Sequence, residues 1–170
     1  MPTNARDALT ALAALLAPDV PEVGGRVLAA HDDPAGFLAA HADRLDERGI
    51  DEPVPNLAWI ALVDALADHG LLAEVDWKED PQEVLAQLRV LRSSPADAAW
   101  GRVDGVDTAV PTFDFLVAAG SALRAGGTAL AVLDIESDCY PLVLLPADRA
   151  DELVGLAATA GFTAGVLGDG

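Results

Sequence analysis

The chain has 170 residues, of which 52 % are hydrophobic and 22 % are charged, a balance typical of a globular domain with an apolar core. Its 28 acidic residues outnumber its 10 basic residues, which gives a net charge of −18. This charge opposes binding to nucleic acid or to an anionic membrane, and it favours a basic protein or cations as partners. Cys139 is the only cysteine, and we find no signal peptide or membrane-spanning run, so we expect a cytoplasmic protein.

The N-terminal part of the chain is mainly helical in pattern. Leucines recur at helical spacing over residues 3–17, which predicts a helix with Thr3 as its cap. Over residues 19–32 the pattern is weaker, because Gly24 and Gly25 lie in its middle. We therefore expect a broken helix or a loop in that segment.

A second clear helix is predicted over residues 34–48, with Pro34 at its first position and Gly49 at its end. His41 lies on the apolar stripe of this helix. A histidine in that position is more often packed at the boundary of a core than bound to a metal. Residues 50–56 then form a proline-rich linker.

The most apolar helix is predicted over residues 57–69. A helix that is apolar nearly all round is usually covered on both sides. Asp64 is the exception within it, and we interpret Asp64 as a solvent-facing residue one turn before Asp68, slightly repelled by that second carboxylate. The alternative is a partly buried Asp64 that needs a hydrogen-bond donor or a cation.

The middle of the chain contains a strand-like pattern at residues 71–77 and a helix at residues 81–91. Residues 93–110 show no periodicity, which predicts a long loop of the kind that often serves as a lid or binding segment. Trp100 is the distinctive residue of this loop. We expect it to pin the loop to the body of the protein, and the alternative is an exposed anchor for a partner.

The C-terminal part begins with a helix predicted over residues 112–125. Its inner face is expected to consist of Phe113, Leu116, Val117, Gly120 and Leu123, with the glycine marking a close approach of another element. A hairpin follows, with strands at 128–134 and 139–145 that are apolar on both faces, which indicates a sheet covered on both sides. A helix over 148–160 and a last strand over 162–167 complete the pattern.

These elements predict a single α+β domain over residues 1–170. About six helices would pack on a sheet of roughly four strands, mixed or antiparallel, and the N-terminal half would be helical. The class follows from the order of the elements. Helices follow one another in the first half of the chain, and strands alternate with helices in the second half.

Two motifs carry a family resemblance. They are LAWIALVDAL at residues 57–66, followed by a strand that ends at Trp77, and LDIESDCYPLV at residues 133–143. With them the segment 56–161 resembles a bacterial domain-of-unknown-function family of small acidic proteins, whereas residues 1–50 lie outside the resemblance. That family has no assigned activity, so the resemblance implies a recurrent stand-alone domain and no catalytic role.

The turn of the hairpin carries three carboxylates at alternate positions, Asp134, Glu136 and Asp138, together with Ser137. Like charges this close together must be solvated, protonated or neutralised by a cation. We interpret the segment as a polar turn whose aspartate and serine side chains bind the backbone. The same turn is also a candidate recognition tip for a basic partner.

A divalent-cation site is the other alternative for this turn. A regular calcium loop is excluded, because Cys139 stands where the loop requires glycine and Leu145 where it requires glutamate. An irregular site built on the turn would need a further carboxylate, from Asp64 or Asp76. Such a site would hold the only cofactor that the sequence suggests.

Three functional hypotheses follow. The first is a non-catalytic protein-interaction module, an adaptor or an antitoxin-like neutraliser of a basic partner, because no nucleophile, zinc or phosphate-loop pattern is found. The second is a metal-dependent hydrolase that uses the hairpin carboxylates, and the third is a small-ligand site under the 93–110 loop. The candidate binding residues are Asp64, Asp76, Trp77, Trp100, Asp134, Glu136, Ser137, Asp138 and Tyr140, and the candidate metal ligands are Asp64, Asp134 and Asp138.

Overall fold

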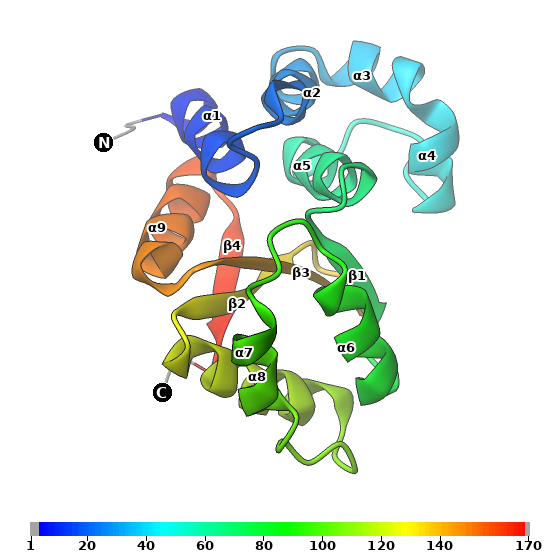
Figure 1. The fold of residues 1–170 in the computed structure, drawn as a ribbon. Helices are drawn as coiled ribbons and strands as arrows, with labels where there is room; N and C mark the ends of the chain where they lie inside the picture. Colours follow the sequence, from blue (N-terminus) through cyan, green and yellow to red (C-terminus); the bar gives the residue numbers. More distant parts are fainter. Residues whose placement is uncertain (1–3, 169–170) are drawn as a thin grey trace.

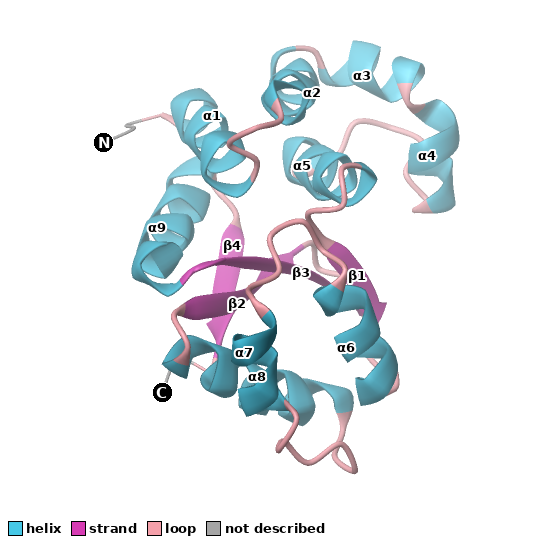
Figure 2. Cartoon of the chain, in the orientation of Figure 1, coloured by secondary structure: helices cyan, strands magenta, loops and turns pink. Residues whose placement is uncertain are grey.

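The computed structural model describes residues 4–168, in which an antiparallel four-stranded sheet lies between two layers of helices (Figure 1 and Figure 2). The strands are β1 (Ala73–Asp76), β2 (Thr128–Asp134), β3 (Cys139–Pro146) and β4 (Thr163–Leu167), in the spatial order β1-β3-β2-β4. The predicted hairpin therefore forms the two central strands, and the predicted α+β class with an antiparallel sheet is confirmed.

Residues 4–168 contain nine α-helices, compared with the six or so that the sequence predicts. They are α1 (Ala5–Leu16), α2 (Pro21–Asp32), α3 (Pro34–Ala40), α4 (Ala42–Glu47), α5 (Leu57–Asp68), α6 (Pro81–Arg89), α7 (Asp97–Val103), α8 (Thr112–Ala125) and α9 (Ala150–Ala160). Within this described part of the chain, no helix combines the length and the hydropathy that a bilayer span requires.

The two helical layers pack on opposite faces of the sheet. Helices α1, α2, α5 and α9 cover one face, where Ala131, Leu133 and Val143 join their core. Helices α6, α7 and α8 cover the other face, where Leu130 and Leu142 point. Successive residues of a strand point to opposite faces, so apolar residues at every position of the hairpin serve both cores. The prediction of a sheet covered on both sides is confirmed.

The predicted break at residues 19–32 is wrong, because α2 runs through both glycines. Val23 and Val27 are buried between α2 and its neighbours. Gly24 lies so close to α1 that an added Cβ would meet the Ala13 Cβ at 3.6 Å. Tertiary packing therefore outweighs the low helical propensity of glycine in this segment.

The predicted helix over residues 34–48 is interrupted at His41, which separates α3 from α4. The His41 ring stacks on Phe37 with the ring centroids 4.2 Å apart, and His41 itself is half-buried. The boundary position predicted for this histidine is therefore confirmed. The N-terminal cap of α1 is Asn4, whose side chain accepts a hydrogen bond from the Asp7 N–H, and Thr3 lies outside the described residues.

The long loop predicted over residues 93–110 is wrong in part, because it contains α7. This helix has only 7 residues, too few to show a helical period in the sequence. Trp100 on α7 is 3 % exposed, and its Nε1 donates a hydrogen bond to the Ser94 Oγ at 2.9 Å. Trp100 therefore pins this segment to the body, as expected, and the alternative of an exposed anchor is wrong.

The inner face of α8 differs from the predicted one. Phe113 and Val117 face outward, whereas Phe115 and Ala119 are buried beside the correctly predicted members of the face. Gly120 does mark a close approach, because the carbonyl of Leu167 in β4 occupies the place that a Cβ would take. The rotation of α8 leaves Phe113 on the surface, where it becomes part of the candidate site.

Candidate interaction site at the hairpin turn

The turn between β2 and β3 is held by its own side chains. The Asp134 Oδ1 accepts a hydrogen bond from the Glu136 N–H at 2.7 Å, and the Ser137 Oγ accepts one from the Cys139 N–H at 3.1 Å. Glu136 adopts a positive φ of 59°. These contacts confirm the interpretation as a polar turn, in which Asp134, Glu136, Ser137 and Asp138 are all exposed.

Helix α5 fixes where the turn lies. The Trp59 Nε1 donates a hydrogen bond to the backbone oxygen of Asp134 at 2.9 Å, and Ile135 is buried in the same core. Trp59 also stacks on Phe162, with the ring centroids 5.0 Å apart. The two sequence motifs of the family resemblance therefore touch each other, and the exposed carboxylates are presented by a rigid base.

Asp64 is buried, with 2 % of its surface exposed, so the prediction of a solvent-facing aspartate is wrong. Its Oδ1 accepts hydrogen bonds from the Arg48 Nη2 at 2.6 Å and from the Arg44 Nη2 at 3.3 Å. Arg48 in turn reaches Glu74 on β1, with an Nη2 to Oε1 distance of 2.6 Å. Both faces of α5 are covered, and Arg48 supplies the compensating cation that a buried carboxylate needs.

Asp68 is not the idle neighbour of Asp64 that the sequence suggested. It forms ion pairs with Arg26 at 2.7 Å and with Arg44 at 2.8 Å. Burial by itself would raise the pKa of Asp68, but the hydrogen bonds from Arg44 and Arg26 outweigh burial and hold this pKa below its ordinary value. In Arg48, burial lowers the pKa, but the hydrogen bonds to Glu74 and Asp64 outweigh it and raise this pKa above its ordinary value.

A hollow of about 550 Å³ separates this network from the hairpin turn. Its polar lining includes Arg44, Arg48, Glu74, Glu136 and Ser137. The Arg48 guanidinium is paired with Asp64 and Glu74. Glu136 is the carboxylate that the turn contributes to the hollow, and it has no basic partner among residues 4–168. Both arginines that line the hollow are already paired with carboxylates, so the hollow does not resemble a site for an anion.

The predicted candidate metal ligands do not form one site. Asp64 is taken up by the arginines, and Asp76 accepts a hydrogen bond from the Lys78 N–H at 2.9 Å. Within residues 4–168, no group of three or more histidine, cysteine, aspartate or glutamate side chains converges in a way that could hold a metal ion. The hydrolase hypothesis therefore has no metal centre in the described part of the chain.

The opposite side of the hairpin carries exposed aromatic residues. Trp77 is 49 % exposed and Phe113 is 47 % exposed, and the half-buried Tyr140 lies against Phe113 with the ring centroids 6.0 Å apart. We call Trp77, Phe113 and Tyr140 the aromatic surface. Two hollows of about 450 and 300 Å³ adjoin it, and both are lined by Phe113 and Tyr140. The two hollows therefore meet at these two side chains.

Carboxylates surround the aromatic surface. Glu79 and Asp80 line the larger hollow, and Asp134 lines the smaller one. Lys78 is the only basic residue lining either hollow, and its Nζ lies 4.6 Å from the centroid of the Trp77 ring. The surface is therefore apolar at its centre and acidic at its margin.

Cys139 also lines the smaller hollow, but its chemistry argues against a nucleophile. Burial raises the pKa of the Cys139 thiol, and the nearby charges of Glu74 and Asp76 raise it further. A reactive cysteine requires the opposite shift, towards the thiolate. The sequence-based argument against catalysis by this residue agrees with its surroundings.

The structure sorts the predicted binding residues into two groups. The end of the hairpin brings together Asp76, Trp77, Asp134, Glu136, Ser137, Asp138 and Tyr140. Asp64 and Trp100 are buried elsewhere. Sequence reasoning missed Phe113, which it placed in the core, and it missed Arg48 and Glu74, which lie far from Asp64 in the sequence. The exposure of Phe113 depends on the rotation of α8 about its axis. The sequence does not decide this rotation, because either Phe113 or Phe115 could face the core.

The fold and this site define a three-layer α+β domain that presents an aromatic and acidic surface at one end of its sheet. The model of a protein family described as a domain of unknown function (DUF6630) matches residues 8–168, and the chain belongs to this family. The match takes in the N-terminal helices as well as the segment 56–161 that carries the two motifs. No curated protein and no solved structure matches the chain.

Proposed function

We propose that the protein is a non-catalytic interaction module that binds a basic protein, in the manner of an adaptor or an antitoxin-like neutraliser. The observation that carries the proposal is the exposure of Trp77 and Phe113 on one concave surface bordered by carboxylates. Within this proposal the module works in the cytoplasm and without a cofactor.

Large aromatic side chains are the residues most often found at the centre of a binding site. They bury a large area and lose little conformational freedom, so tryptophan and tyrosine are frequent among the side chains that contribute most binding energy. Trp77 and Phe113 are the two exposed aromatic residues of the described chain. Their position beside one another on the aromatic surface supports a single partner rather than unrelated exposure.

The acidic margin selects the chemistry of the partner. Asp80 and Asp134 border the surface, and the chain as a whole carries a net charge of −18. Such a field attracts a basic partner from a distance and raises the association rate, an effect that salt weakens. A partner segment that carries lysine or arginine beside an apolar side chain fits both parts of the surface.

The test is a pull-down from lysate with the wild-type chain and with a Trp77→Ser/Phe113→Ser variant, each at low and at moderate salt. The proposal expects a basic protein that the wild type retains at low salt, retains less at moderate salt, and that the variant loses. Because both replaced side chains are exposed, the variant should remain folded, which its circular dichroism spectrum will show.

Val90→Ser is the matched control, because Val90 is 79 % exposed and lies outside the aromatic surface. It should retain the same protein as the wild type does. The proposal is wrong if the aromatic variant and the control retain the protein equally, if the retained protein is not basic, or if retention does not depend on salt.

A further inference from the structure

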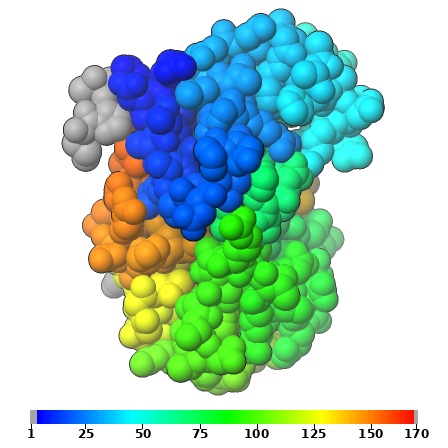
Figure 3. Space-filling model, turned by 45° about the horizontal axis from the view of Figure 1, so that its top comes forward, coloured from blue at the N-terminus to red at the C-terminus, as the bar shows by residue number. Residues whose placement is uncertain are grey.

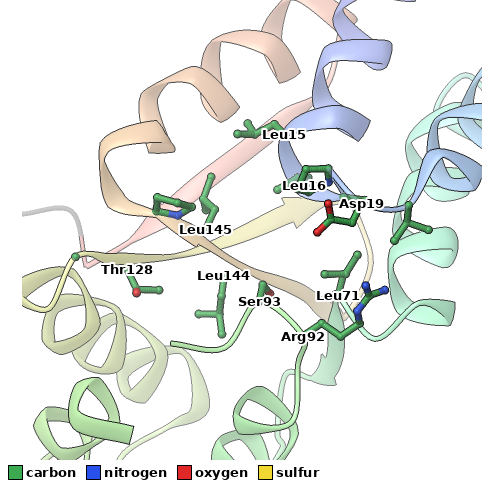
Figure 4. Close-up of a pocket in the computed structure, with 14 residues that line it drawn as sticks. Leu15, Leu16, Asp19, Leu71, Arg92, Ser93, Thr128, Leu144 and Leu145 are labelled. Carbon is green, nitrogen blue, oxygen red and sulfur yellow. The ribbon is translucent and has the colours of Figure 1, made fainter. Parts of the chain in front are cut away.

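A second cavity, of about 360 Å³, lies at the other end of the sheet, where β2 begins and β3 ends (Figure 4). Its apolar walls are Leu15, Leu16, Leu71, Leu144 and Leu145. They come from α1, from the segment before β1 and from β3. In Figure 3 the blue N-terminal part of the chain lies against the green middle part and the orange C-terminal part. This volume lies within the range of small-molecule sites.

Ser93 contributes a buried hydroxyl group close to this cavity. Ser93 lies between α6 and α7 and lines the cavity near Leu144 (Figure 4). Its Oγ is shielded from solvent and has no hydrogen-bond partner among residues 4–168. Because this Oγ has almost no accessible surface, a ligand in the cavity does not reach it, and Ser93 serves as part of the wall and not as a donor.

The backbone of β3 adds a polar group. Trp77 N–H donates to the Asp138 oxygen, which shows that even-numbered residues of β3 direct their backbone groups towards β1. The pairing of β1 with β3 ends at Ala73 opposite Leu142. Leu144, two residues further on, therefore directs its N–H and C=O to a side of β3 that has no strand beside it. That side borders the cavity.

The rim of the cavity supplies the charge. Arg92 lines the cavity and forms no ion pair with residues 4–168. Its Nη1 donates a long hydrogen bond of 3.4 Å to the backbone oxygen of His69. Asp19 lies on the same rim, also without an ion pair among the described residues. A guanidinium without an ion pair has a carboxylate as its preferred ligand.

We propose that this cavity binds a small aliphatic carboxylate. The alkyl group would lie among the leucines, and the carboxylate would accept hydrogen bonds from Arg92. A free aliphatic acid and an aliphatic amino acid share this chemistry. They differ in an α-ammonium group, which Asp19 on the rim would recognise. The site is separate from the aromatic surface and does not depend on the proposed function.

The experiment is a titration of the full chain, followed by amide chemical shifts, with three molecules that share one branched alkyl framework. Isocaproate carries the carboxylate alone, L-leucine carries the carboxylate and the α-ammonium group, and isoamylamine carries the amine alone. Isocaproate should cause saturable shifts at Ser93, Thr128 and Leu144, and isoamylamine should cause none. Tighter binding of L-leucine than of isocaproate assigns the amino acid as the source, and weaker binding assigns the free acid.

Arg92→Gln should weaken isocaproate binding by about tenfold, because a hydrogen-bonded charge pair is lost. Arg102→Gln is the matched control, because Arg102 is an exposed arginine on α7, outside the cavity, whose replacement changes the net charge equally. The amide spectrum of each variant shows directly whether it is folded.

The proposal is overturned if isocaproate produces no saturable shift at millimolar concentration, or if the shifts lie away from the cavity. It is also overturned if isoamylamine binds as well as isocaproate does. Equal affinities of Arg92→Gln and Arg102→Gln would overturn the assignment of the carboxylate to Arg92.

Discussion

Two groups of carboxylates on either side of one hollow behave in opposite ways. The buried Asp64 and the half-buried Glu74 share the Arg48 guanidinium, whereas Asp134 and Asp138 are exposed on the hairpin turn. The first group joins α4, α5 and β1 into one body. The second group has no basic partner among residues 4–168 and faces outward.

The difference shows that the role of an acidic residue depends on which basic side chains contact it in the fold, and not on its neighbours in the sequence. In the sequence, Asp64 lies on a helix and the turn carboxylates lie in a cluster, so the cluster is the more conspicuous candidate for a special site. For the stability of the fold, the structure makes the buried Asp64 more important than the turn carboxylates. Removal of the buried Asp64 would leave a poorly solvated arginine without its partner, whereas the exposed residues remain free to meet a partner.

The largest effect expected from this comparison is that of Asp64→Ala. The replacement leaves the Arg48 guanidinium, whose side chain is only 19 % exposed, without its most buried partner. Breaking a buried pair on one side is strongly destabilising, so the free energy of unfolding should fall by about 3 kcal/mol. Urea denaturation followed by circular dichroism measures it, and a loss as small as that of an exposed residue would contradict the contrast between the two groups.

Replacing the whole network should be milder than breaking it. A triple variant, Arg48→Met with Asp64→Leu and Glu74→Gln, removes both charges of the buried pair and the acidic partner on β1. Buried ion pairs replaced by apolar groups of similar volume are often neutral in stability, so the triple variant should be more stable than Asp64→Ala. The same urea experiment compares them. If the triple variant were less stable than Asp64→Ala, the network would stabilise the fold by more than the pairing of its charges.

The pH dependence of stability should expose Asp68. Its pKa is lowered in the folded protein, so it contributes stability above the pKa of the unfolded chain, near 4, and this contribution is lost as the pH falls through the lower folded pKa. The urea midpoint of the wild type should therefore fall on acidification below about pH 4. Asp68→Asn should show a shallower fall over the same window, and parallel curves for the two proteins would refute the assignment.

The smallest effect on stability is expected at the turn. Asp138 is exposed, and its side chain forms no ion pair or hydrogen bond with residues 4–168. Asp138→Asn should change the free energy of unfolding by at most about 0.5 kcal/mol. The same variant should slow association with the basic partner and reduce its salt dependence, as measured by surface plasmon resonance. A large loss of stability would remove the distinction between the two groups.

Much of the fold could be predicted because its signals are local. The hairpin was evident from two apolar runs around a polar turn, and α6 from Asp80 and Pro81 at its start, where the Asp80 side chain accepts a hydrogen bond from the Gln82 N–H. Helices α2 and α7 were missed for two different reasons. Burial against neighbours stabilises α2 despite its glycines, and α7 is too short to show a period.

The candidate site was less predictable because its contacts are distant in sequence. Arg48 lies 16 residues from Asp64 and 26 residues from Glu74, and no spacing rule connects these three residues. The aromatic surface depends on whether Phe113 or Phe115 faces the core, a choice made by the packing of α8 on β2 and β4. The turn residues and Tyr140 could be named in advance because they share one local motif, and Asp76 and Trp77 because they end a strand-like pattern.

The strand order β1-β3-β2-β4 also has a consequence for how the chain folds. The two central strands are neighbours in sequence and close a loop of only a few residues, so the hairpin can form before any distant contact. The Trp59 Nε1 reaches the Asp134 oxygen across 75 residues of chain, a closure that comes at a much higher entropic cost. Folding is therefore expected to begin at the hairpin, with the N-terminal helices docking on it afterwards.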